Sequence, residues 1–419
     1  MTVRRRSLSA QSALSALTAV LTVLVLGLVA APAVDASPAS LQQREWWIGR
    51  LGLRQVWSIS KGSGVTVAVI DTGVDTSVPD LQGAVVPGFS VADSGSPNVA
   101  HDAGGHGTSM AIDIAGRGRE PGILGVAPQA KIMPVYLPDT AFGDTATALN
   151  RLSAMSRPPQ IVSMSYGVFD TCPDDLQAAV ARAVARGMIL VASAGNSGDA
   201  ANESQFPANC KGVVAVGAFD ADGAAWSGSQ RQPYVSIGGP GVNIVTYNRA
   251  RQIGTNTGTS PAAAIVAGEL ALLRSHFPSI PPRQLVARLF ATASKSLYHG
   301  PRYGQSGDVL GFGPAVIQYA MTRSVPATAP NPVYDDLAAA VPTAAPSSPA
   351  SASTPTASPG SGMPTGDVGV SFPGSGAASA HKSGGSSSGF ILAAVGAAVV
   401  LVLGVTAVAV RRRNADRSR

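Results

Sequence analysis

Short runs of mostly apolar, often β-branched residues constrain the fold of this chain more than any other feature of its sequence. Each run is five or six residues long, and each ends at or near a glycine. Short strands that are apolar on both sides are typical of a sheet covered on both faces. The four runs are residues 65–70, 161–165, 188–193 and 213–217.

Helical patterns separate these runs. Residues 174–184 are the clearest case, because they begin with two aspartates and are followed by a basic residue and a glycine, Arg186 and Gly187. Acidic residues at the start and basic residues at the end of a helix are favoured by the helix dipole, and a glycine commonly ends a helix. Alternating strands and helices predict an α/β fold with a doubly wound, parallel sheet. In such folds the functional groups gather at the carboxyl ends of the strands.

Four polar residues are the candidate functional groups. Taken singly, each has an ordinary structural explanation, such as a turn or a helix cap. Together they occur in the order Asp, His, Asn, Ser, which turns and caps explain poorly, and they fit acyl transfer by a serine nucleophile. They are Asp71 and Asn196, which each follow a predicted strand, His106, which lies in a glycine-rich segment, and Ser260, which precedes an apolar helix.

The motifs around these four residues resemble those of the subtilisin-like serine protease family over about residues 65–320. They read Asp-Thr-Gly from residue 71, Gly-His-Gly-Thr from residue 105, Ser-Ala-Gly-Asn from residue 193 and Gly-Thr-Ser from residue 258. Residues 125–128 are similar to the segment that follows the histidine helix in that family. The triplet Ser165, Tyr166 and Gly167 is similar to its substrate-binding edge strand.

The resemblance implies a subtilisin-like protease domain over residues 65–323, with helices on both faces of a mostly parallel sheet. It also implies a serine endopeptidase that hydrolyses peptide bonds through an acyl-enzyme. Ser260 would be the nucleophile, His106 the general base and Asp71 the group that orients the histidine. The side chain of Asn196 and the backbone N–H of Ser260 would form the oxyanion hole, and residues 165–167 would bind a protein or peptide substrate. No cofactor is expected; structural calcium occurs in the family, but no acidic loop here has convincing ligand spacing.

Three residues depart from the family pattern. Pro261 stands where the family usually has Met or another larger side chain, Ala264 stands in place of Pro, and Ile112 in place of Gly. Proline has no N–H, but this type of oxyanion hole uses the N–H of the nucleophile itself. The departures therefore bear on packing and turnover and remove no catalytic group.

The amino-terminal segment predicts export. Three arginines at residues 4–6 precede an apolar run over about residues 13–31, and small residues follow it. This pattern is typical of a signal peptide, here over residues 1–36. The alternative is an uncleaved amino-terminal anchor.

The carboxyl-terminal segment predicts a membrane anchor. Residues 390–410 carry no charge, and 21 residues of helix span ~30 Å of hydrocarbon. Three arginines follow, so the tail, residues 411–419, is expected in the cytoplasm and the body outside a single-pass cell membrane span. A buried core helix is the alternative. Residues 327–389 are rich in Pro, Ser, Ala, Thr and Gly, and they are expected to form an extended linker.

The net charge of +6 gives no indication of a nucleic-acid partner. Eight of the 30 basic and two of the 24 acidic residues lie before residue 37 or after residue 410, so the remainder holds 22 of each. A neutral body does not predict a polyanion as a partner.

The chain has two cysteines, Cys172 and Cys210. A cysteine pair in an exported protein usually forms a disulfide, and we expect one that joins two loops. A two-cysteine metal site is the alternative, but no histidine lies near either residue in the sequence.

The arrangement of all segments resembles mycosins, the membrane-anchored proteases of actinobacterial type VII secretion systems. Residues 57–65 are also similar, and residues 41–64 resemble the mycosin amino-terminal extension that wraps around the protease body. The resemblance implies subunits of a type VII secretion complex as partners. It leaves a second function open, in which the protein is mainly a structural subunit of that complex.

Overall fold

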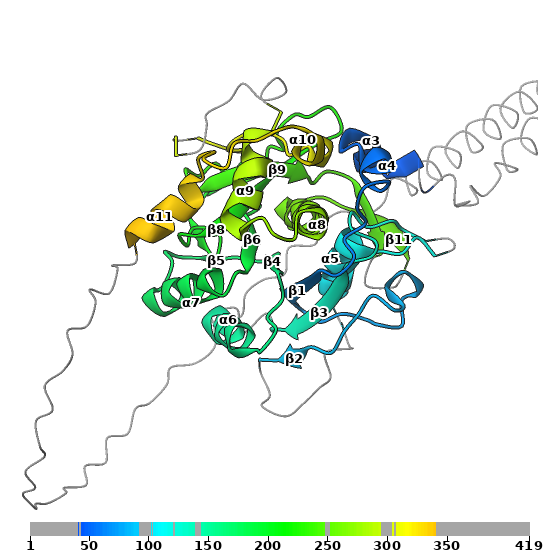
Figure 1. Cartoon of the computed structure of the whole chain (residues 1–419), viewed down its shortest axis with the longest axis horizontal. Coiled ribbons are helices and arrows are strands. Elements are labelled where there is room, and N and C mark those ends of the chain that lie inside the picture. The colour runs from blue at the N-terminus through cyan, green and yellow to red at the C-terminus, as the bar shows by residue number, and fades with distance from the viewer. Residues whose placement is uncertain are drawn as a thin grey trace, which may run out of the picture. The chain divides into compact units, whose positions relative to one another are not determined.

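A seven-stranded sheet lies at the centre of the protein in the computed structural model, and all its neighbouring strands are parallel (Figure 1). The structure describes residues 41, 43–91, 102, 104–119, 122–138, 144–247, 252–294, 304–305 and 307–340. In spatial order the strands are β2 (Phe89–Ser90), β3 (Lys131–Tyr136), β1 (Thr66–Asp71), β4 (Ile161–Met164), β6 (Ile189–Ser193), β8 (Val213–Phe219) and β9 (Val235–Pro240).

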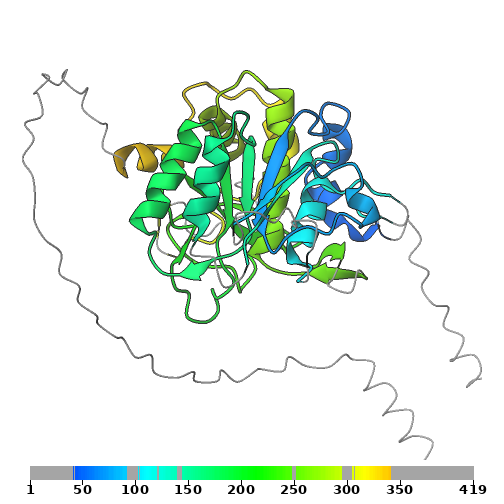
Figure 2. The ribbon, with the colours of Figure 1, turned by 90° about the horizontal axis from the view of Figure 1, so that it is seen from below.

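Helices cover both faces of the sheet, as the apolar strands predict (Figure 2). In β1, Val67 and Val69 face one layer, whereas Ala68 and Ile70 face the other. The first layer holds α5 (His106–Ala115), α8 (Thr259–His276) and α9 (Pro282–Ala291); the second holds α6 (Thr145–Ala154) and α7 (Asp174–Ala185).

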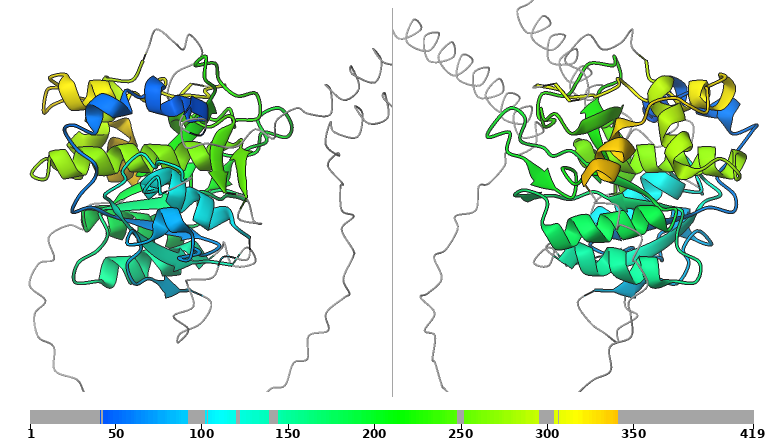
Figure 3. Two further views of the ribbon diagram at one scale, coloured as in Figure 1. Left: turned by 90° about the vertical axis from the view of Figure 1, so that its right-hand side faces the viewer. Right: turned by 60° about the vertical axis from the view of Figure 1, so that its left-hand side comes forward.

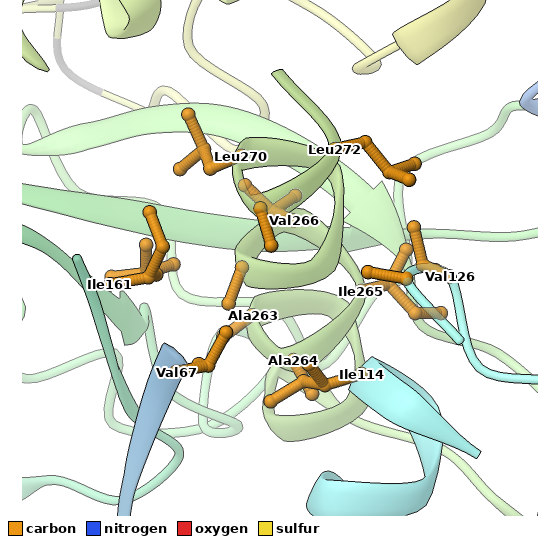
Figure 4. Packing of buried hydrophobic residues seen from close by; sticks show 14 of the residues in the cluster. Val67, Ile114, Val126, Ile161, Ala263, Ala264, Ile265, Val266, Leu270 and Leu272 are labelled. Atoms are coloured by element: carbon orange, nitrogen blue, oxygen red, sulfur yellow. The ribbon is translucent and has the colours of Figure 1, made fainter. Parts of the chain in front are cut away.

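Helix α8 lies in the middle of the first layer, and small residues let it approach the sheet closely. Figure 4 shows Ala263 beside Val67 of β1, and Ala264 beside Ile114 of α5. Gly268 faces Val126, where a Cβ atom would come within 2.7 Å of the valine side chain. Ala264 is completely buried, so its departure from the family pattern is absorbed by core packing.

The segment over residues 41–64 packs against the body. Its two short helices, α3 (Trp46–Arg50) and α4 (Leu53–Val56), lie beside α10 (Ile317–Thr322) (Figure 3). The indole N–H of Trp46 donates to the carbonyl of Val242 at 3.1 Å, and the carbonyl of Leu51 accepts from the backbone N–H of Gln318 at 3.3 Å. The amino-terminal segment is therefore tied to parts of the chain almost 200 residues or more away.

Residues 332–340 differ from the expectation of a linker over residues 327–389. They form helix α11 (Pro332–Ala340), which buries Val333, Tyr334 and Leu337. Arg283 of α9 also pairs with Asp335 at 2.9 Å. The folded body therefore extends to Ala340, because three apolar side chains on one helix face outweigh the linker-like composition around them.

Three smaller elements complete the described fold. These are the antiparallel pairs β5 (Val168–Phe169) with β7 (Gln205–Phe206) and β10 (Ile244–Tyr247) with β11 (Ile253–Asn256), and the 3-10 helix η1 (Pro79–Leu81). No helix within the described part of residues 41–340 is long and apolar enough to cross a membrane. The expected signal peptide and the expected span over residues 390–410 lie outside the described residues.

Candidate active site

The four candidate residues lie at strand ends and helix starts. Asp71 is the last residue of β1, and Asn196 follows β6 by three residues. His106 begins α5, and Ser260 is the second residue of α8. Because the strands are parallel, the ends of β1 and β6 lie at the same edge of the sheet.

Asp71 and His106 form a hydrogen-bonded pair. The Nδ1–H of His106 donates to Oδ1 of Asp71 at 2.8 Å. The Asp71 side chain is 3% exposed, whereas the His106 side chain is 37% exposed. The carboxylate is therefore hidden behind the imidazole, whose other nitrogen is left for chemistry.

The charge of Asp71 raises the pKa of His106 to about 9. Burial opposes this effect, and the hydrogen bond to Asp71 and the carboxylates of Asp102 and Asp113 add to it. The imidazolium is thus stabilised in the free protein, and a base at this position needs alkaline conditions to be fully neutral.

Ser260 exchanges hydrogen bonds with Ser165. The hydroxyl of Ser260 donates to the carbonyl of Ser165 at 3.0 Å, and the hydroxyl of Ser165 donates to the carbonyl of Ser260 at 3.0 Å. No hydrogen bond joins Ser260 to His106 among the described residues. The structure therefore links the expected nucleophile to the expected substrate-binding edge instead of to the base.

The amide of Asn196 is held by its oxygen. Its Oδ1 accepts from the backbone N–H and from the hydroxyl of Thr259, both at 2.9 Å. The hydroxyl oxygen of Thr259 in turn accepts from the backbone N–H of Gly195 at 3.0 Å. With the oxygen engaged, the exposed NH₂ group is the end of this amide that can reach a ligand.

A cavity of about 270 Å³ adjoins Ser260 and Asn196. Its lining includes all three residues of the expected substrate-binding edge, Ser165, Tyr166 and Gly167. The Tyr166 side chain is nevertheless directed into the core: it is buried, its hydroxyl bonds that of Thr145 at 3.0 Å, and burial raises its pKa.

Gln205 of β7 lines the same cavity and was missed by the sequence analysis. Its buried side chain lies against two glycines: a Cβ on Gly167 would come within 2.3 Å of it, and a Cβ on Gly195 within 2.7 Å. Its amide N–H donates weakly to the carbonyl of Ser193 at 3.5 Å. In the sequence, Gly167 and Gly195 indicate that something packs closely there, but they do not identify Gln205 as the side chain that does so.

Phe169 belongs to the wall of this cavity, and the disulfide lies just beyond the strand that carries Phe169. Phe169 of β5 lines the cavity and is 56% exposed. The expected disulfide between Cys172 and Cys210 is present, and it joins the segments that follow β5 and β7. It therefore braces the small sheet that carries Phe169 and Gln205.

A second cavity, of about 250 Å³, adjoins His106. The start of α5 forms one side, and β10 and β11 form the other. The hydroxyl of Ser109 donates to the carbonyl of Tyr247 at 2.6 Å and ties the two sides together. Asn256, four residues before Ser260, also lines this cavity, whereas Ser260 itself lines the first one.

No group of three or more His, Cys, Asp or Glu side chains in the described parts of the chain is arranged to hold a metal ion.

Comparisons with known proteins show the family of the chain. The Subtilase family matches residues 62–313. The major intracellular serine protease of Bacillus subtilis (strain 168) is 36% identical over 224 residues, which cover 52% of this chain and 70% of that protein. The crystal structure of MycP1 from Mycobacterium smegmatis superimposes with a TM-score of 0.58 at 25% identity, covering 67% of this chain and 85% of that one. MycP3, a protease from the type VII (ESX-3) secretion system, gives a TM-score of 0.56 at 30% identity, with 70% and 90% covered. Both solved structures are mycosins.

Proposed function

The chain belongs to the subtilase family of serine proteases, and from this premise we propose that it is a membrane-anchored, extracytoplasmic endopeptidase that uses Asp71, His106 and Ser260 as its catalytic triad. The observation that carries the triad is the 2.8 Å bond between His106 and the hidden Asp71 carboxylate; His106 lines one of the two cavities, and Ser260 lines the other.

In this proposal the Ser260 hydroxyl turns from the Ser165 carbonyl towards Nε2 of His106 when substrate binds. The imidazole removes the hydroxyl proton as Oγ attacks the peptide carbonyl carbon. Asp71 holds the Nδ1–H tautomer and stabilises the imidazolium. The imidazolium then gives its proton to the leaving amine, which leaves an acyl-enzyme at Ser260 that water hydrolyses by the same sequence of proton transfers.

The oxyanion of the tetrahedral intermediate would be held by the NH₂ group of Asn196 and the backbone N–H of Ser260. Thr259 supports this role, because its two hydrogen bonds to Oδ1 turn the other end of the Asn196 amide outwards. Ser260 lies in the first turn of α8, where backbone N–H groups have no partner within the helix. In this proposal both donors are oriented before substrate arrives, and such preorganisation makes an oxyanion hole effective.

The cavity beside Ser260 would receive the side chain that precedes the scissile bond. Buried Gln205 is part of its wall and provides polar groups there. We therefore infer that substrates carry a small or polar side chain at this position.

Cleavage of a peptide library by the full-length protein in detergent tests the proposal. Ser260→Ala should abolish cleavage with little change in thermal unfolding, and Asn196→Ala should lower kcat by about 10²–10³-fold. Ser153→Ala is the matched control, because that hydroxyl donates to the carbonyl of Leu149 within helix α6, away from both cavities. Full turnover by Ser260→Ala would exclude the proposed triad.

We further propose that the protein works with a type VII secretion complex. The support is its likeness to MycP3, whose name places that protein in such a system. Affinity purification from native membranes should recover membrane subunits of the complex with the wild type and with Ser260→Ala alike. Recovery of the subunits with the inactive variant would favour a structural role alongside cleavage. If neither the wild type nor the variant recovers them, the association is contradicted.

A further inference from the structure

Asp102 lies outside the proposed triad, yet its carboxylate accepts four hydrogen bonds at the entrance to α5. Oδ1 accepts from the hydroxyl of Thr72 and from the backbone N–H of Gly105, both at 2.8 Å. Oδ2 accepts from the backbone N–H of Thr108 at 2.8 Å and from its hydroxyl at 2.7 Å. One carboxylate therefore joins the residue after Asp71 to the first turn of the helix that begins with His106.

Helix α5 has no cap of its own. Its N-cap residue is Gly105, which has a left-handed φ of 76° and no side chain to bond the first turn. The first N–H groups of a helix need partners from outside. Asp102 supplies one to Thr108, the third residue of the helix, and places a negative charge at the positive end of the helix dipole. The orientation of the His106 backbone thus depends on a residue four positions earlier.

The Thr72 hydroxyl has two acceptors for its single proton. It lies 2.8 Å from Oδ1 of Asp102 and 3.3 Å from Oδ1 of Asp71. The second oxygen is the one that accepts from His106. While Asp102 is present, the proton goes to the shorter contact. Without Asp102, the proton would turn to Asp71 and compete with His106 for the same oxygen.

We propose that Asp102 is a positioning residue for the Asp71–His106 pair. It fixes the first turn of α5 against the end of β1, and it keeps the Thr72 hydroxyl from the Asp71 oxygen that His106 uses. The inference rests on the proposed function, because it takes His106 as the catalytic base.

Asp102→Ala in the full-length protein tests this role by kinetics. We expect kcat to fall by about 10–100-fold, as small misplacements of catalytic groups do. KM should change little, because Asp102 does not line either cavity. The rising limb of kcat/KM against pH should move to lower pH, since one of the three carboxylates that favour the imidazolium, Asp71, Asp102 and Asp113, is lost.

Asp102→Asn separates charge from shape. Its amide oxygen can still accept from Thr72 and Gly105, so kcat should be higher than in Asp102→Ala. The rising limb of kcat/KM should still lie at lower pH than in the wild type, because the charge is lost. Asp220→Asn is the control, because Oδ1 of Asp220 accepts two backbone N–H groups in a loop away from the site. That variant should lose stability without a change in kcat or in the limb.

A titration independent of cleavage completes the test. In Ser260→Ala protein with ¹⁵N-labelled histidine, Asp102→Ala should lower the pKa of His106 measured by NMR. If the wild type does not cleave peptides, the proposed function fails, but this titration still reports on Asp102. If Asp102→Ala leaves kcat and the pH dependence of kcat/KM unchanged, or leaves the pKa of His106 unchanged, the proposed role of Asp102 is overturned. Should Asp102→Ala fail to fold, the kcat and pH profile of Asp102→Asn answer the same question.

Discussion

The pKa of His106 decides when the proposed base can accept a proton. Asp71 raises that pKa to about 9. We predict that kcat/KM rises with pH along a limb whose midpoint lies above 6.5, the ordinary histidine value. His106→Ala should remove activity and limb together, and His276→Ala should leave both in place. A midpoint at or below 6.5 would show that Asp71 does not act on the imidazole as the geometry implies.

The same shift has a consequence for stability. A histidine whose pKa is higher in the folded than in the unfolded protein stabilises the fold fully below pH 6.5, and that contribution disappears as the pH rises through about 9. In a Ser260→Ala background, the free energy of unfolding lost on His106→Ala should therefore be larger at pH 6 than at pH 10.

Gln205 provides the third prediction at this scale. Gln205→Ala removes the side chain that lies against Gly167 and Gly195, so the cavity beside Ser260 should deepen. Peptides with leucine or phenylalanine before the scissile bond should gain about tenfold or more in kcat/KM relative to peptides with serine. Gln129→Ala is the control, because that residue is exposed and lines neither of the two cavities. An unchanged ratio would mean that Gln205 does not limit the depth of the site.

The sequence was sufficient to find residues that stand in a local motif. It was not sufficient for residues whose role depends on contacts between distant parts of the chain. Asp71 and His106 stood in motifs, and the structure joins them. Asp102 carried no motif of its own; three of its hydrogen bonds come from Gly105 and Thr108 nearby in the sequence, but the one from Thr72 exists only because β1 and α5 meet. The Ser260 rotamer was equally unpredictable, since it depends on the Ser165 carbonyl across the site.

At the scale of elements, the apolar strands β1, β4, β6 and β8 were predicted, whereas β3, β9 and the short pairs were not. Two-residue strands such as β5 and β7 are too short to show an alternating pattern. They nevertheless form the wall that carries Gln205, and the disulfide that braces them was predicted from the cysteine count alone. Helix α11 was missed for another reason: the Pro- and Ala-rich surroundings of residues 332–340 outweighed three apolar residues.

The amino-terminal segment gives a prediction at the same scale. Glu45, beside α3, is buried, and burial raises its pKa to about 7. Its Oε1 accepts from the backbone N–H of Leu124 at 2.8 Å, while Oε2 is buried and has no hydrogen-bond partner among the described residues. Nearby Asp80 raises the pKa further, although less than burial does.

A carboxyl whose pKa is raised by folding stabilises the protein most when protonated, below pH 4.5, and loses that contribution as the pH rises through about 7. Glu45→Gln keeps an oxygen for Leu124 and cannot ionise. It should raise the free energy of unfolding by about 2–3 kcal/mol at pH 8 and by much less at pH 4.5, measured by urea denaturation. Glu203→Gln, away from the amino-terminal helices, is the control. Equal effects at both pH values would contradict the assigned cause.

At the scale of the whole molecule, the helix that ends the body bears on the proposed anchor. Helix α11 is fixed by buried Val333, Tyr334 and Leu337 and by the pair between Arg283 and Asp335. A membrane tether would therefore begin after Ala340. We therefore expect the chain up to Ala340 to resist proteolysis and the chain after it to be cut.

The last prediction concerns the topology that the charge-free run over residues 390–410 and the three arginines after it imply. Protease added outside intact cells should release a soluble fragment that ends between residues 341 and 389, because packed backbone resists cleavage and Pro- and Ser-rich chain does not. Ser260→Ala protein should give the same fragment, which excludes self-cleavage as its source. A fragment that appears only after the membrane is broken would place the body on the other side. A cut before residue 332 would show that α11 does not hold to the body in the cell.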